Sequence, residues 1–271
     1  MIKNSWALTL RLVLMLFILY TAFVSNTAAQ ATAMESGRKP VVVELFTSEG
    51  CSTCPPADAL LQKLEEEQPV PGAEIVALEE HVDYWDHDGW SDPYDSPAWT
   101  QRQMVYKELF RTNEVYTPQM VVDGQTQFVG SDERKALLAI DQAARRAQPG
   151  VTLTPGEMDP KGSQRFSVSV EKLIGNTPGD VVLVWLAVTE SGLQSSVTRG
   201  ENAGRVLHHS ATLRSLHKIG VASTGAGPVS FTGTPDVKIE SRWNREKLRA
   251  IVFIQEKKSG KILGGASAKI P

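Results

Sequence analysis

The sequence predicts two folded domains, an α/β domain in the N-terminal half and an all-β, sandwich-like domain in the C-terminal half. The chain has 271 residues, which exceeds the usual size of one domain, about 100–200 residues. Strand-like and helix-like stretches alternate as far as Gly150, whereas short strand-like stretches follow one another after it. The expected boundaries are 1–33 for a signal peptide, 38–149 for the first domain and 150–271 for the second.

The first 33 residues have the pattern of a secretory signal peptide. Lys3 and Arg11 precede an apolar run at 12–24, which is shorter than the roughly 20 apolar residues that a membrane span needs. Small residues follow it, and Ala31-Thr32-Ala33 offers a cleavage site. An uncleaved anchor is the alternative. We expect a periplasmic or secreted protein with no stable membrane span after cleavage.

Composition and charge argue against several function classes. The net charge is −3 and no long run of one sign occurs, whereas nucleic-acid binding usually needs a basic patch, so we expect no nucleic-acid partner. The chain also lacks a GxxxxGK[ST] phosphate loop and the GxSxG turn that presents a nucleophilic serine. We predict no cofactor and no resident metal, and the sequence leaves the oligomeric state open.

The first domain is expected to have the order β-α-β-α-β-β-α. Residues 41–46 are a β-branched run of strand length. After Pro55, the apolar residues Leu60, Leu61 and Leu64 lie on one face of a helix. The later elements are a strand at 74–78, a helix from Ser96-Pro97 to about Phe110, strands at 119–122 and 125–129 joined by Asp123-Gly124, and a helix from Ser131 that ends before Pro149.

The second domain is expected to consist of successive strands. Residues 166–170 alternate between apolar and small polar side chains, which is typical of a strand with one buried face. The continuous apolar run at 181–189 predicts a strand buried on both faces. Further candidate strands are 229–232, 237–239, 248–255 and 261–266. Many strands with few helical patterns favour a sandwich.

Cys51 and Cys54 are the strongest candidate site. They are the two cysteines of the chain and lie between a strand and a helix that opens at Pro55. Unpaired N–H groups and the positive end of the helix dipole favour a thiolate at that position. A bridge between such near neighbours closes almost no loop and stabilises a fold little. We therefore expect Cys51 to be an exposed nucleophile and Cys54 to be the resolving thiol. An inert disulfide and half of a zinc site are the alternatives.

Thr117-Pro118 stands before the predicted strand at 119–122. With the element order and the C-x-x-C at the first helix, this pattern resembles the thioredoxin superfamily. The resemblance implies a thioredoxin-like first domain, a cis Pro118 against the disulfide, and Thr117 in the substrate groove. It also implies that Glu44 corresponds to the buried acid of that family, whereas Glu49-Gly50 replaces its usual tryptophan. Without the resemblance, a proline at a strand start is usually trans.

Four motifs resemble a narrower family, secreted bacterial thioredoxin-like proteins of unknown function (domain of unknown function 1223). They are residues 44–58 (ELFTSEGCSTCPPAD), 81–85 (HVDYW), 116–119 (YTPQ) and 202–205 (NAGR). The resemblance covers nearly the whole chain after the signal peptide. It implies a fold but no reaction, because the activity and substrate of that family are not established.

Two further stretches are candidates for binding. The stretch from His81 to Tyr94 is rich in aromatic, carboxylate and histidine side chains, and long ordered loops are often functional. It could line the cysteine groove with Trp85 as a substrate-binding residue, bind a metal through His81, His87 and aspartates, or bind a partner through Trp85 and Trp90. The alternative is a long insertion that packs on its own aromatics. His208-His209 could be a metal or partner site, or ordinary strand surface.

The leading hypothesis is an exported thiol–disulfide oxidoreductase that acts on protein or small-molecule thiols and disulfides. Cys51 would attack, and Cys54 would resolve the mixed disulfide. The alternative is a non-catalytic binding protein of the cell envelope, in which the two cysteines sense redox state or bind Cu(I). Fold alone does not choose between these hypotheses.

Overall fold

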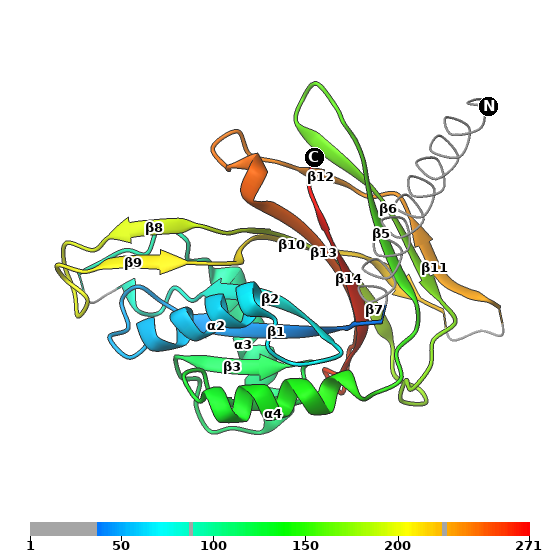
Figure 1. Ribbon diagram of the computed structural model, residues 1–271, viewed down its shortest axis with the longest axis horizontal. Helices are drawn as coiled ribbons and strands as arrows, with labels where there is room; N and C mark the ends of the chain where they lie inside the picture. The colour runs from blue at the N-terminus through cyan, green and yellow to red at the C-terminus, as the bar shows by residue number, and fades with distance from the viewer. Residues whose placement is uncertain (1–36, 87–88, 224–226) are drawn as a thin grey trace, which may run out of the picture. The chain divides into compact units, whose positions relative to one another are not determined.

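A single mixed sheet of eight strands organises the protein (Figure 1). The computed structural model describes residues 37–86, 89–223 and 227–271, so the predicted signal peptide at 1–33 lies outside the described residues. Along the sheet, the strands are β14 (Ile262–Lys269), β13 (Leu248–Glu256), β7 (Val182–Glu190), β10 (Thr212–Ala222), β2 (Ala73–His81), β1 (Lys39–Thr47), β3 (Gln119–Val122) and β4 (Thr126–Val129).

This sheet corrects the predicted fold class. A thioredoxin-like α/β domain followed by a separate all-β sandwich is wrong, because β10 of the C-terminal half pairs in parallel with β2 at Thr212 and Glu79. The Glu79 N–H also donates to the Ala211 carbonyl at 2.9 Å. Pairing with β10 covers backbone groups that β2 would otherwise leave open as an edge strand. Sequence periodicity describes each strand alone and carries no information on this long-range pairing.

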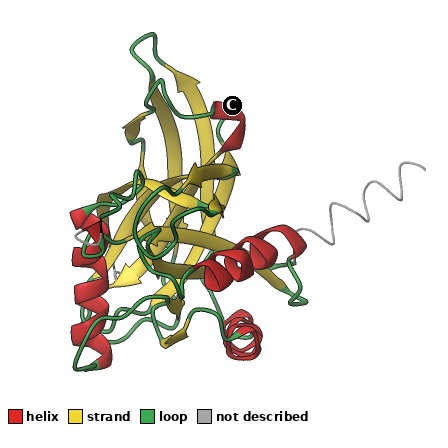
Figure 2. Cartoon of the chain, turned by 90° about the vertical axis from the view of Figure 1, so that its left-hand side faces the viewer, coloured by secondary structure: helices red, strands yellow, loops and turns green. Residues whose placement is uncertain are grey.

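In the described part of the chain, three α-helices pack against the faces of the N-terminal strands (Figure 2). They are α2 (Pro55–Glu67), α3 (Pro97–Phe110) and α4 (Glu133–Ala144). Side chains of β1 alternate between the two faces, as the pleat requires. Val41, Val43 and Leu45 pack with α2 and α4, whereas Val42 packs with Trp99 of α3. The predicted helical stripe is confirmed, because Leu60, Leu61 and Leu64 are all buried.

The remaining strands form two small sheets (Figure 1). One contains β5 (Val151–Met158), β6 (Ser163–Glu171), β11 (Val229–Gly233) and β12 (Asp236–Lys238), and the other contains β8 (Leu193–Ser196) and β9 (Val206–His209). Phe166, Val168 and Val170 of β6 are buried, as their alternation predicts, and pack with apolar residues of β7 and β13. A short 3-10 helix, η2 (Arg245–Lys247), precedes β13.

One hydrophobic cluster contains residues of both halves of the chain. Val76 and Leu78 of β2 pack with Leu213 of β10 and Phe253 of β13. The Phe253 ring also stacks on Trp185 of β7, with 6.5 Å between the ring centroids. Since neither half can bury this cluster alone, the two halves are expected to fold together.

Replacing Phe253 tests this shared core. Phe253 has no solvent-exposed surface, so Phe253→Ala should lower the free energy of unfolding by about 3–5 kcal/mol. The loss should appear in one transition, with tryptophan fluorescence and far-UV circular dichroism giving the same midpoint. Val221→Ala, at a position 53% exposed on β10, should change stability by less than about 0.5 kcal/mol. Two separate transitions, only one of which moves in Phe253→Ala, would contradict a shared core.

Asp123 predicts a pH dependence of stability. Its buried carboxylate accepts a 2.9 Å hydrogen bond from the Val42 N–H, and burial raises its pKa to about 7. The folded protein therefore binds this proton more tightly than the unfolded chain, and this group's contribution to stability falls as pH rises from about 4 to 7. Asp123→Asn replaces the carboxyl group by an amide that does not titrate, and asparagine tolerates the positive φ of this turn. The stability of the variant relative to the wild type should rise by about 1–4 kcal/mol between pH 4.5 and 8 in urea titrations; parallel curves would contradict the assignment.

Candidate functional site

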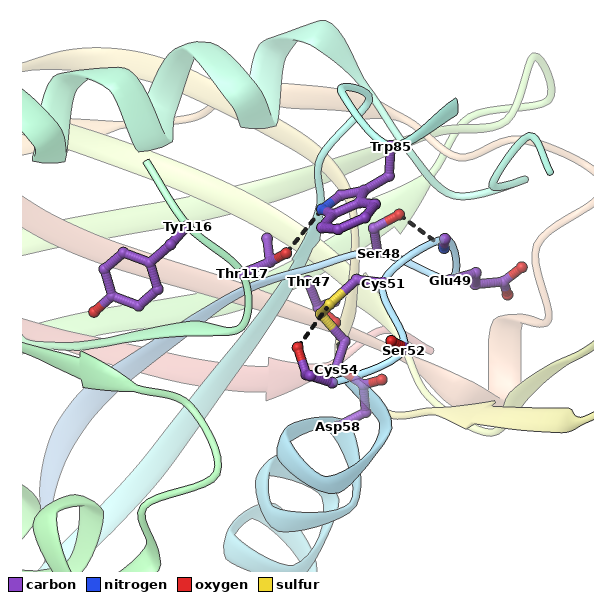
Figure 3. The surroundings of a disulfide bond; sticks show 12 residues. Thr47, Ser48, Glu49, Cys51, Ser52, Cys54, Asp58, Trp85, Tyr116 and Thr117 are labelled. Atoms are coloured by element: carbon purple, nitrogen blue, oxygen red, sulfur yellow. Dashed lines mark hydrogen bonds between the residues drawn. A yellow bond between two sulfur atoms is a disulfide. The ribbon is translucent and has the colours of Figure 1, made fainter. Parts of the chain in front are cut away.

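Cys51 and Cys54 form a disulfide in the loop between β1 and α2 (Figure 3). Cys54 immediately precedes the first turn of α2, and its carbonyl accepts from the backbone N–H groups of Ala57 and Asp58 at 2.8 and 3.1 Å. Cys51 is 1% exposed and Cys54 is 0% exposed. The expectation of an exposed Cys51 is therefore wrong for this closed, oxidised state. Neither cysteine is open to solvent in this state.

Trp85 lies beside the disulfide (Figure 3). Its indole Nε1 donates to the Thr117 hydroxyl at 2.8 Å. A Cβ atom on Gly50 would lie 2.8 Å from the Trp85 Cβ, so glycine at position 50 permits this close approach. The Thr117–Pro118 peptide is cis, as the thioredoxin resemblance implies. The structure thus brings the predicted residues Trp85 and Thr117 together at the cysteine pair.

A loop of the C-terminal half holds the cysteine loop. The fully buried Asn202 side chain donates through Nδ2 to the carbonyls of Glu49 and Cys51, at 2.8 and 2.9 Å. Glu201 accepts from the Ser52 N–H at 3.0 Å through its Oε2. Asn202 belongs to the NAGR motif, which the sequence analysis could quote only as part of a resemblance. The two hydrogen bonds from Asn202 fix the backbone on both sides of Gly50.

Asp58 is a buried acid on the helix side of the disulfide. It lies one helical turn after Cys54 and accepts a 2.6 Å hydrogen bond from the Thr47 hydroxyl. Burial, with a smaller effect from Glu79, raises the pKa of Asp58 to about 7. A carboxyl group with such a pKa can accept and return a proton near neutral pH. Glu44, which the resemblance assigned to this role, instead binds Arg102 and Tyr106 of α3 on the opposite face.

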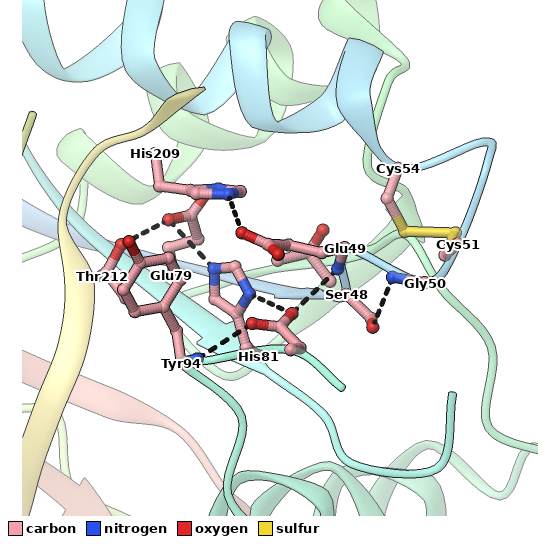
Figure 4. A network of polar contacts seen from close by, with 12 residues as sticks. Ser48, Glu49, Gly50, Cys51, Cys54, Glu79, His81, Tyr94, His209 and Thr212 are labelled. Carbon is pink, nitrogen blue, oxygen red and sulfur yellow. Dashed lines mark hydrogen bonds and ion pairs between the residues drawn. A yellow bond between two sulfur atoms is a disulfide. The ribbon is translucent and has the colours of Figure 1, made fainter. Parts of the chain in front are cut away.

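A group of ionisable side chains, here called the buried network, lies next to the disulfide (Figure 4). Each of its members is at most 3% exposed. The members are Glu49, Glu79, His81, Asp92 and His209. They come from the cysteine loop, from β2, from the segment after β2 and from β9, so both halves of the chain contribute.

Glu79 is the centre of the buried network. His209 Nδ1 lies 3.2 Å from Glu79 Oε1, and His81 Nε2 lies 3.3 Å from Glu79 Oε2. The outer nitrogens contact the other two carboxylates, with His81 Nδ1 2.7 Å from Asp92 and His209 Nε2 3.0 Å from Glu49. Thr212 also donates to Glu79 Oε2 at 2.7 Å.

The carboxylates control protonation within the network. Burial alone would lower the pKa of His209, but the negative charge of Glu79 and the hydrogen bonds to Glu49 and Glu79 outweigh it and raise the pKa to about 9. Burial likewise opposes the charge of His81, and Asp92 and Glu79 raise its pKa well above the usual value. The histidines in turn overcome the effect of burial on Glu79 and lower its pKa to about 2. The neighbouring carboxylates thus favour protonation of both imidazoles.

The sequence analysis found some of these residues and missed others. It named His81 and the pair His208-His209; His81 is the buried last residue of β2, and His209 is buried whereas His208 is exposed. His87 and Asp88 lie outside the described residues. Glu79 and Asp58 were not singled out. The signal for Glu79 is the triplet Glu79-Glu80-His81 at the end of an otherwise apolar strand, because charged residues are seldom buried without partners.

Comparisons with known structures agree with this architecture. A protein of Agrobacterium tumefaciens with a crystal structure is 26% identical, with a TM-score of 0.59 over 84% of this chain and 92% of that chain. HBP35 of Porphyromonas gingivalis is 13% identical, with a TM-score of 0.63 over 86% of this chain and 76% of that chain, a likeness of fold alone.

Two further comparisons bear on the class of protein. No curated protein sequence matches this chain. Among the described residues, no helix has the length and apolar character needed to cross a bilayer. The family of proteins of unknown function DUF1223 matches residues 42–255. The chain therefore belongs to the DUF1223 family, as its sequence motifs implied.

Proposed function

We propose that the protein is an exported thiol–disulfide oxidoreductase. In the reducing direction, the Cys51 thiolate attacks a substrate disulfide and releases one substrate thiol. Cys54 then attacks Cys51, which releases the second substrate thiol and closes the Cys51–Cys54 disulfide. The substrates are protein or small-molecule disulfides, and the reverse sequence oxidises dithiols.

The observation that carries the proposal is the disulfide at the N-terminus of α2, with a protonatable acid one turn behind it. The helix N-terminus favours a thiolate on Cys51 through the positive end of its dipole. Cys54 must lose a proton before it can resolve the mixed disulfide, and the Asp58 carboxylate is a suitable acceptor because its pKa is about 7.

Export is proposed on two grounds. The first 33 residues have the sequence pattern of a signal peptide. A closed disulfide between the two cysteines of a chain also suits an oxidising compartment, since cytosolic thiols are kept reduced. A periplasmic or secreted location fits both observations.

For a substrate to reach Cys51, the side chain of Trp85 must move away from the disulfide. Both sulfur atoms are buried in the closed state, whereas Trp85 is only partly buried and its indole N–H makes one hydrogen bond, to Thr117. We assign Trp85, Thr117 and Pro118 to the substrate groove. A substrate chain would displace the indole and take its place beside Cys51.

A second function is favoured by the burial of the disulfide. Exchange catalysts usually present a partly exposed cysteine, whereas here Asn202 also holds the Cys51 carbonyl from the other half of the chain. A non-catalytic protein that senses redox state would keep its cysteine pair closed in this way. Binding of Cu(I) by the reduced thiols remains a prediction of this second hypothesis.

The reduction potential and a trapping variant distinguish the two functions. If the protein is an oxidoreductase, the cysteine pair should equilibrate with glutathione buffers at a potential between about −270 and −120 mV. Cys54→Ser should accumulate mixed disulfides with exported proteins, because Cys51 can still attack and nothing resolves the bond. Both are read by thiol alkylation followed by non-reducing electrophoresis.

The matched control for trapping is Cys51→Ser, which keeps one cysteine but removes the attacking thiol. It should trap far less protein than Cys54→Ser. A disulfide that glutathione does not reduce, together with no trapped protein in Cys54→Ser, would exclude the oxidoreductase and leave the redox-sensing or binding protein.

Removal of the indole tests whether Trp85 limits access to the disulfide. Trp85→Ala should increase the rate at which dithiothreitol reduces the disulfide by roughly 5- to 30-fold, which corresponds to about 1–2 kcal/mol. Thr117→Val keeps the indole but removes its hydrogen-bond acceptor, so the rate should rise less. Reduction rates follow from alkylation time courses on the folded protein. A wild-type rate in Trp85→Ala would show that Trp85 does not control access.

A further inference from the structure

Two histidines from different halves of the chain each direct one ring nitrogen at the same carboxylate (Figure 4). His81 ends β2 and His209 ends β9. Their Nε2 and Nδ1 atoms face the two oxygens of Glu79 at 3.3 and 3.2 Å. The ligand atoms of these three side chains all lie within 4.8 Å of one another. The three donors therefore converge on one small volume.

The outer nitrogen of each histidine contacts a different carboxylate. His81 Nδ1 lies 2.7 Å from Asp92, and His209 Nε2 lies 3.0 Å from Glu49. Histidines that bind metal ions nearly always donate their other ring N–H to a carboxylate, a carbonyl or water, which fixes the ring and raises its basicity. Both histidines of the network have this arrangement, and in both the inner nitrogen is the one that faces Glu79.

The inner nitrogen of His81 also lacks a hydrogen bond. Its ring is fully buried, and among the described residues Nε2 has no hydrogen-bond partner although Glu79 is 3.3 Å away. A buried polar atom without a partner is destabilising by about 1–3 kcal/mol. A metal ion at the convergence point of the three donors would replace the protons on the two inner nitrogens and would give this atom a partner.

The spacing of the donors fits a transition metal. Tetrahedral zinc with bonds of about 2.0–2.1 Å separates neighbouring ligand atoms by roughly 3.3 Å. The inner nitrogens of His209 and His81 lie 3.2 and 3.3 Å from different oxygens of Glu79, so an ion between them would be bound by the two imidazoles and by one or both carboxylate oxygens. Two imidazoles and one carboxylate form a common ligand set for zinc, with a fourth position left for water or another donor. Calcium and magnesium prefer oxygen ligands alone and fit this set poorly.

We propose that Glu79, His81 and His209 bind one divalent first-row transition metal ion, with Zn²⁺ as the probe. Asp92 and Glu49 orient the two histidines from outside the coordination sphere. The site does not use the cysteines as ligands, and its assignment does not rest on the proposed exchange reaction. A bound ion would link β2 to β9, and thereby the N-terminal half to the C-terminal half, close to the cysteine loop.

Metal content tests the site directly. The oxidised protein is stripped with EDTA, dialysed against ZnCl₂ and analysed by mass spectrometry for zinc per chain. One zinc per chain is expected for the wild type, and at least a 100-fold weaker affinity for His209→Gln and for His81→Gln. His208→Gln is the matched control, because His208 is the exposed neighbour of His209 on the same strand. It should bind zinc as the wild type does.

A cysteine double variant tests whether the cysteines bind the zinc, and Co²⁺ spectra report the ligands of the bound ion. Cys51→Ser/Cys54→Ser should retain the zinc, and Asp92→Asn should weaken binding by about 10- to 100-fold, as expected for an orienting carboxylate. Co²⁺ bound to the wild type should give the strong visible bands of tetrahedral nitrogen and oxygen coordination, whether or not the histidine variants fold. A wild type without stoichiometric zinc and without these bands, or equal zinc loss in His208→Gln and His209→Gln, would overturn the proposal.

Discussion

The parallel contact between β10 and β2 brings the C-terminal half of the chain to the candidate site. It joins Thr212 to Glu79 in register, with the Glu79 N–H bound to the Ala211 carbonyl. His209 precedes this contact by only a few residues, so the contact brings it to the end of β2, where His81 lies. Without it, Glu79 and His81 would be charged groups on a sheet edge, and water would solvate them. With it, they are buried and must find partners within the protein, which is the origin of the network.

The same contact explains how the cysteine loop is held. Glu49 is 1% exposed, and its polar groups all have partners: the N–H donates to Asp92, the carbonyl accepts from Asn202, and the side chain binds His209 and Trp90. These partners come from the segment after β2 and from the C-terminal half. The C-terminal half therefore completes the surroundings of the disulfide, which the N-terminal elements could not bury alone.

Local features of the sequence predicted local structure well. The strand before Cys51, the helix after it and the apolar stripe at Leu60, Leu61 and Leu64 follow from residue patterns within a few turns. The fold class was wrong because strand patterns do not show which distant strands will pair. The same limit applies to the site. His81 and His209 lie 128 positions apart, and only the β2–β10 pairing places their rings 4.6 Å from each other.

The positions of the buried acids show why the site could not be derived residue by residue. The resemblance implied Glu44 as the buried acid near the cysteines, but the pleat of β1 sends Glu44 to the α3 face and Thr47 to the α2 face. Thr47 binds Asp58, whereas Glu44 pairs with Arg102. The disulfide thus has an acid of pKa about 7 on its helix side and the carboxylate–histidine network on its strand side. Glu49 belongs to both the cysteine loop and the network, so opening of the cysteine loop must disturb the contact that orients His209.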